Sequence, residues 1–143
     1  MYLLTFRYRY DGTPQNILDD FGRLDVRVST ACFSGTGGFW VQWQDVKEFG
    51  ASLGTYPISA DAPLAAQWGY NMQEGDDLIL KVEIAPANAS GDLKVAVEIA
   101  DDNNRSNRVR TSFTTNYPDL LSFQSQIAQL MTGEIDEAVL SGR

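Results

Sequence analysis

The chain has 143 residues, of which 43% are hydrophobic and 21% are charged, so it is long enough to form one domain with a sizeable core. It contains no histidine, which excludes imidazole-based catalytic triads and every histidine-ligated zinc site. The net charge of −8 disfavours nucleic acid as a partner, and no apolar run approaches the ~20 residues that a membrane-spanning helix needs. We therefore expect a single domain over residues 1–143 that binds neither nucleic acid nor membrane.

Cys32 is the only cysteine, so neither an intrachain disulfide nor a cysteine-ligated metal cluster can form. With no histidine to activate it, Cys32 is predicted to be a small apolar side chain embedded in a strand rather than a nucleophile. The first ten residues alternate in polarity and include Arg7 and Arg9, so they lack the continuous apolar stretch of a signal peptide. The expected location is cytoplasmic.

Alternating apolar residues predict three strands near the start of the chain, over residues 4–10, 24–28 and 39–44. The first is expected to end at residues 11–14, and the second to extend toward Phe33. The glycine-rich segment 34–38 is predicted to be a hairpin loop. It is not a phosphate-binding loop, because it has no lysine and leads into a strand.

A helix is predicted next, with Asp45 as its cap, Glu48 completing a capping box and Gly54 ending it. A weak strand over residues 64–70 follows.

Two strands over residues 78–84 and 93–99 then predict an antiparallel hairpin. Its allowed registers place either Lys81 opposite Glu98 or Glu83 opposite Lys94, and each pairs opposite charges.

The last elements are a strand over residues 108–115, a helix that opens at residues 117–119 with Pro118 in its first turn, and a tail. The tail, residues 134–143, is expected to be a short C-terminal segment of one or two amphipathic turns. The predicted order is βββαββββα with one strand weak, and the short links between strands favour antiparallel pairing. The fold class is therefore α+β: a curved antiparallel sheet of about six to seven strands with two helices packed on it.

The excess of negative charge lies entirely in residues 45–102, where there are eleven acidic residues and three lysines, because acids and arginines balance in the rest of the chain. The start of one strand of a hairpin lies beside the end of its partner, so the acids that flank the predicted hairpin should gather at one end of the sheet. These acids are Glu74, Asp76, Asp77, Asp101 and Asp102.

Three interpretations of this acidic group remain open. A basic protein partner could be steered to it, a hard cation could bind its oxygens, or the acids are ordinary turn residues partly neutralised by Arg105 and Arg108. The spacing matches no EF-hand loop, which places the cation behind the other two, and no metal site is predicted.

The chain is predicted not to be an enzyme. No acidic residue lies on the apolar face of a predicted strand, so the buried acid of paired-carboxylate chemistry has no candidate. We assign no catalytic residue and no cofactor.

Most aromatic residues are expected in the core, including Trp43, which shares a face with Phe39 and Val41. Trp40 shares its face with Gln42 and Gln44 and is therefore expected to be exposed, or to meet a helix or a second subunit. A homodimer formed through Trp40 or through an uncovered sheet edge is compatible with the sequence.

Several stretches resemble, in order, the WapI-type immunity proteins, which are partners of the contact-dependent toxin WapA, and related bacterial proteins. These stretches are the strand 24–28 with its turn at 33–35, the helix 45–53, the strands 77–83 and 93–99, and the segment 113–121. The resemblance covers roughly residues 19–131. It implies a toxin-neutralising protein that blocks a cognate toxin domain by stoichiometric binding, and the acidic group described above favours a basic toxin domain.

The alternative function is that of a small-ligand-binding protein. Its cavity would lie under the curved sheet and be lined by aromatic residues such as Tyr8, Trp43 and Trp68.

Overall fold

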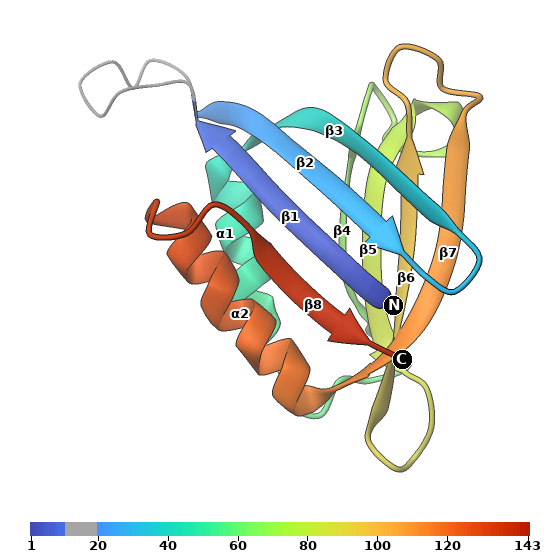
Figure 1. The fold of residues 1–143 in the computed structure, drawn as a ribbon, viewed down its shortest axis with the longest axis vertical. Helices are drawn as coiled ribbons and strands as arrows, with labels where there is room; N and C mark the ends of the chain where they lie inside the picture. The colour runs from blue at the N-terminus through green and yellow to red at the C-terminus, as the bar shows by residue number, and fades with distance from the viewer. Residues whose placement is uncertain (11–19) are drawn as a thin grey trace.

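The computed structural model describes residues 1–10 and 20–143, and within them it shows an α+β fold of eight strands and two α-helices (Figure 1). The strands form two antiparallel sheets of four, in the orders β3-β2-β1-β8 and β4-β5-β6-β7. The predicted α+β class is confirmed. The prediction of a single sheet of about six to seven strands is wrong, because the eight strands form two sheets. The strands of one sheet cross those of the other obliquely in Figure 1.

The first sheet consists of β1 (Tyr2–Tyr10), β2 (Phe21–Ser29), β3 (Ser34–Gln42) and β8 (Ala138–Gly142). The alternation that predicted β1 and β2 is confirmed, because Leu4 and Phe6 of β1 and every second residue of β2 from Gly22 to Val28 are buried, while the residues between them are partly or fully exposed. β2 ends at Ser29 and does not continue to Phe33. The predicted end of the first strand, residues 11–14, lies outside the described residues.

The glycine-rich segment belongs to β3, so its prediction as a hairpin loop is wrong. The turn lies earlier, where the Thr30 N–H donates to the carbonyl oxygen of Phe33 over 2.7 Å. Gly37 faces the second sheet, and a Cβ atom on it would lie 2.6 Å from Cγ2 of Ile99. Glycine is therefore needed here for close approach of the two sheets rather than for a turn.

Cys32 lies in the turn between β2 and β3 and is exposed. Its prediction as a strand-embedded side chain is wrong, because β2 ends three residues before it.

The second sheet consists of β4 (Leu64–Gly69), β5 (Leu78–Pro86), β6 (Asp92–Ala100) and β7 (Arg108–Asn116). A short 3-10 helix, η1 (Gly75–Asp77), precedes β5. The weak strand and the hairpin are both confirmed. Of the two allowed registers the structure has the one that places Lys81 opposite Glu98.

The helices are α1 (Trp43–Ser52) and α2 (Tyr117–Met131). α1 begins at Trp43 with Gln42 as its N-cap residue and no side-chain cap, so the capping box at Asp45 is wrong. Instead, the Trp43 N–H donates to the carbonyl oxygen of Asp20 over 3.0 Å, and the chain passes directly from β3 into the helix. Trp43 is consequently half-buried at a helix start and not a core residue of a strand.

α2 opens as predicted. Pro118 lies in its first turn, and the side chain of Asn116 accepts a hydrogen bond from the Asp119 N–H over 2.8 Å. The cap residue is therefore Asn116, which supplies an acceptor for a helix N–H that has no partner within the helix.

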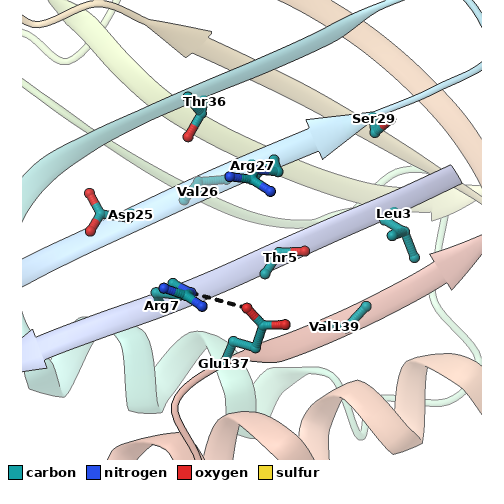
Figure 2. Close-up of a pocket in the computed structure, with 10 residues that line it drawn as sticks. All are labelled: Leu3, Thr5, Arg7, Asp25, Val26, Arg27, Ser29, Thr36, Glu137 and Val139. Carbon is teal, nitrogen blue, oxygen red and sulfur yellow. Dashed lines mark hydrogen bonds and ion pairs between the residues drawn. The ribbon is translucent and has the colours of Figure 1, made fainter.

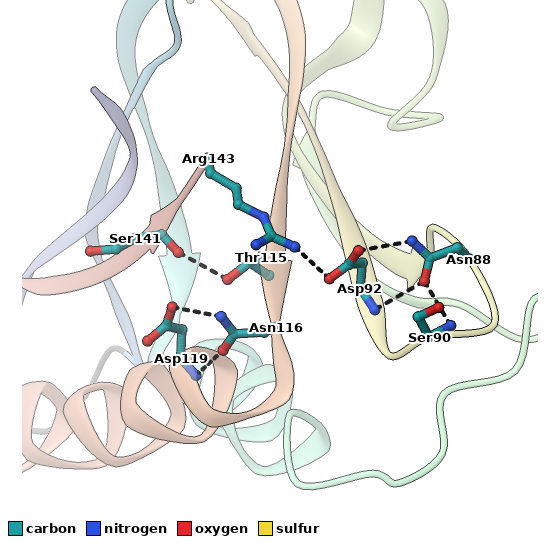
Figure 3. Close-up of polar contacts among 8 residues, drawn as sticks. All are labelled: Asn88, Ser90, Asp92, Thr115, Asn116, Asp119, Ser141 and Arg143. Atoms are coloured by element: carbon teal, nitrogen blue, oxygen red, sulfur yellow. Dashed lines mark hydrogen bonds and ion pairs between the residues drawn. The ribbon is translucent and has the colours of Figure 1, made fainter.

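The predicted amphipathic turns of the tail are wrong, because residues 138–142 form β8 beside β1. Ala138 and Leu140 are fully buried. Beyond β8, Arg143 and Thr114 exchange backbone hydrogen bonds of 2.8 and 3.0 Å, and Arg143 Nη2 donates to Asp92 over 2.6 Å. β8 thus joins the two sheets at one corner, as Figure 3 shows.

The core lies between the two sheets, and the helices close its open side (Figure 1). Phe6 marks its centre: its ring centroid lies 5.4 Å from that of Phe123 on α2 and 6.1 Å from that of Phe49 on α1. Among the described residues, neither helix is long and apolar enough to span a membrane.

Candidate partner-binding site

Two loops lie side by side at one end of the second sheet. The loop between β4 and β5 is held by the Tyr70 N–H, which donates to the carbonyl oxygen of Asp77 over 2.8 Å. The loop between β6 and β7 reaches it through Arg105, whose Nη1 lies 2.9 Å from Oδ1 of Asp77. The antiparallel argument from sequence predicted this juxtaposition. We call the five acids on these loops the acidic end: Glu74, Asp76, Asp77, Asp101 and Asp102.

The five acids differ in how much of their charge is already paired. Asp77 pairs with Arg105, and Asp102 lies 3.4 Å from Arg23 of β2. Asp101 is exposed, and its Oδ1 accepts a hydrogen bond of 2.9 Å from the Asn103 N–H. Glu74 and Asp76 are exposed and form no ion pair within residues 1–10 and 20–143. Asp101, Glu74 and Asp76 therefore carry the charge that a partner could meet.

Arg105 neutralises part of the acidic end, as the sequence suggested, but Arg108 acts elsewhere. Arg108 Nη1 donates to Glu98 over 2.8 Å and to the carbonyl oxygen of Leu78 over 2.9 Å. The expectation that Arg108 neutralises one of the five acids is wrong, because its carboxylate partner is Glu98 on the neighbouring strand β6. Arg108 thus ties β5, β6 and β7 together beneath the loops.

Replacing Arg108 with glutamine is expected to lower the free energy of unfolding by about 1.5 kcal/mol, because Glu98 would lose a charge-assisted hydrogen bond in a largely buried place. The side chains of the pair are only 17% and 15% exposed. The matched control is Arg110→Gln, since Arg110 lies 3.4 Å from the same carboxylate but is 79% exposed. Urea unfolding of both variants measures the difference, and equal losses would contradict the role given to Arg108.

Exposed apolar side chains lie beside the acids, which sequence reasoning missed. Tyr70 is 39% exposed and Met72 is 71% exposed, and both belong to the loop that carries Glu74 and Asp76. The Tyr70 ring is held by Phe39 at 5.1 Å between centroids and by the guanidinium of Arg105 at 5.0 Å. A rigid, partly exposed aromatic ring of this kind is a typical anchor of a protein interface.

Trp40 lies on the outer face of the first sheet and is 49% exposed, so its predicted exposure is confirmed. In β3 it lies opposite Arg23, whose guanidinium bonds Asp102 at the acidic end. Trp40 is therefore the strand neighbour of a residue that reaches the acidic end. The sequence could not predict this link, because the ion pair between Arg23 and Asp102 depends on how the two sheets pack.

In the described part of the chain, no group of three or more histidine, cysteine, aspartate or glutamate side chains is arranged to hold a metal ion. The acids are spread over two loops and two of them, Asp77 and Asp102, are paired with arginine, so their arrangement suits a protein surface better than a cation.

The aromatic residues that were expected to line one cavity line three separate hollows. Trp43 lies in a groove of about 590 Å³ between the helices, Trp68 in one of about 350 Å³ beside α1, and Tyr8 in one of about 400 Å³ at the end of β1. Buried side chains of both sheets and both helices pack together beneath the first sheet, and these three hollows share none of the three aromatic residues.

No family model, no curated protein and no solved structure matches this chain. The resemblance to immunity proteins consequently rests on the sequence pattern alone.

Proposed function

We propose that the protein is a non-enzymatic binding protein that docks a basic protein partner at the acidic end, in the manner of a toxin-neutralising immunity protein. The observation that carries this proposal is the exposure of Tyr70 and Met72 on the same loop as Glu74 and Asp76. Such apolar residues contribute affinity when they are buried by a partner, while the surrounding charge selects and steers it.

The distribution of charge supports a basic partner. The acidic excess of the chain lies in residues 45–102, which contain α1, three strands of the second sheet and the loop of the acidic end. A field of this kind raises the association rate of a cationic protein and weakens as salt is added. Occlusion of the partner's own working surface by stoichiometric binding then requires no catalytic group.

The test begins with capture of partners from the native lysate by the tagged protein and continues with binding kinetics on the purified partner. The variant Glu74→Gln/Asp76→Asn/Asp101→Asn removes three charges but keeps the Asp101 side-chain oxygen that bonds Asn103. We expect the association rate to fall by about tenfold at low salt, with a much smaller difference at high salt.

The matched control is Asp61→Asn/Glu134→Gln/Asp136→Asn, which removes the same charge from exposed positions elsewhere. It should change the association rate by less than about twofold. Equal losses in the two variants would show that bulk charge alone is responsible, and an unchanged rate in the first variant would remove the acidic end from the interface. A third variant, Tyr70→Ala/Met72→Ala, should raise the dissociation rate instead.

A further inference from the structure

The outer face of the first sheet carries positive charge in an otherwise acidic protein. Among the residues that the structure describes, the strand registers place four arginines and one acid, Asp25, on this face, and a second acid, Glu137, lines the hollow beside them. The arginines are Arg7 and Arg9 of β1 and Arg23 and Arg27 of β2.

These two acids are already paired with three of the four arginines. Glu137 lies 3.0 Å from Nε of Arg7, and Asp25 lies 3.4 Å from Arg23 and 3.8 Å from Arg9. Arg27 is exposed and forms no ion pair with any residue that the structure describes. It is therefore the guanidinium on this face that is available to an outside anion.

The surroundings of Arg27 provide hydrogen-bond donors on both sides. In the sheet, Thr5 of β1 and Thr36 of β3 are its direct neighbours in register. Figure 2 shows the Arg27 guanidinium between these two threonines, with no dashed contact to any other residue drawn. Together with Leu3 and Val139 they line a hollow of about 450 Å³.

We propose that this hollow binds a small monocarboxylate that has a short hydrocarbon part. The guanidinium fork of Arg27 matches the two oxygens of a carboxylate, and the hydroxyls of Thr5 and Thr36 can donate to the same group. Leu3 and Val139 offer apolar contact on the side toward β8, where the hydrocarbon part lies.

The apolar part of the lining restricts the class of ligand. Leu3 and Val139 line the same hollow as Arg27, so a carboxylate with a hydrocarbon part gains an apolar contact that inorganic phosphate cannot make. Carboxylate is therefore favoured over phosphate here. The site shares no residue with the acidic end, and its test does not depend on the proposed partner.

Titration of the ¹⁵N-labelled protein with hexanoate, acetate and inorganic phosphate tests the proposal, with the Nε–Hε resonances of the arginines as the readout. We expect a saturable shift of the Arg27 resonance with hexanoate, weaker binding of acetate and weaker binding still of phosphate. Arg27→Gln should weaken hexanoate binding by at least about tenfold, because a charge-assisted contact is lost. Val139→Thr should weaken hexanoate but leave acetate unchanged.

Arg110→Gln is the matched control, since Arg110 is an exposed arginine on the second sheet. It should leave hexanoate binding unchanged. Shifts that do not saturate, or that persist in Arg27→Gln, would overturn the site, and tighter binding of phosphate than of hexanoate would overturn the ligand class.

Discussion

Replacing Gly37 with valine is expected to lower the free energy of unfolding by about 3 kcal/mol, because the new side chain would be forced into the packed contact between the two sheets. A Cβ atom at this position would lie 2.6 Å from Cγ2 of Ile99 and 3.0 Å from the backbone oxygen of Ala100. The Ala100 oxygen belongs to a strand paired on both sides, so it cannot move aside cheaply. The midpoint of urea unfolding, compared with wild type at an unchanged slope, measures the loss.

Gly38→Val is the matched control, one residue along the same strand. A Cβ atom on Gly38 faces the side chains of Asp25 and Arg23 on the outer face, and these flexible ends can shift. The expected loss is about 1 kcal/mol or less, since valine also favours a strand. An Ile99→Ala background should reduce the cost of Gly37→Val, because the shortened side chain makes room. Equal effects at Gly37 and Gly38 would contradict the close sheet contact.

The same glycines explain why the sequence misled the prediction of β3. Residues 34–38 contain three glycines, and in isolation such a composition favours a turn. Here Gly35 and Gly37 alternate on the face toward the second sheet, where Val109 and Ile99 leave no room for a side chain. The need for glycine at these positions comes from the packing of one sheet against the other. A local sequence pattern carries no information about that packing.

The hairpin of β5 and β6 could be predicted because two independent signals agree. β6 alternates from Leu93 to Ile99 and β5 alternates from Leu80 to Ile84, and the register that the structure adopts places Lys81 opposite Glu98, one of the two opposite-charge pairings that the sequence allowed. The structure adds that Glu98 forms its ion pair with Arg108 of β7 while Lys81 lies 3.7 Å from Glu83. The pairing of β5 with β6 could be inferred from the sequence, but which charged side chains form ion pairs across β5, β6 and β7 could not.

The acidic end was likewise predictable only in part. Antiparallel geometry predicts that its five acids lie at one end of the sheet, since they flank the two strands of one hairpin. The contact of Asp102 with Arg23 and the exposed ring of Tyr70 between Phe39 and Arg105 depend on the first sheet lying against that end. No spacing in the sequence predicts these contacts, because the residues are far apart in the chain and belong to different sheets.

β8 escaped prediction because five residues carry too little alternation to distinguish a strand from an amphipathic turn. We expect Leu140→Ala to lower the free energy of unfolding strongly, because β8 lies beside β1 with Leu140 in the core. Leu140 is fully buried opposite Leu4, so the free energy of unfolding should fall by about 3 kcal/mol through lost burial and the cavity left behind. Urea unfolding again provides the measurement.

Val139→Ala tests whether β8 alternates as a strand must. Val139 is partly exposed on the outer face opposite Thr5, so its truncation should cost about 1 kcal/mol or less. If residues 138–142 formed an amphipathic turn instead, the two neighbouring substitutions would not differ in this alternating way. A small loss for Leu140→Ala would mean that β8 does not seal the core at the corner where the Arg143 side chain bonds Asp92 (Figure 3). Hydrogen exchange of the Thr114 amide, which is bonded to the Arg143 carbonyl oxygen, should then be fast even in the wild type.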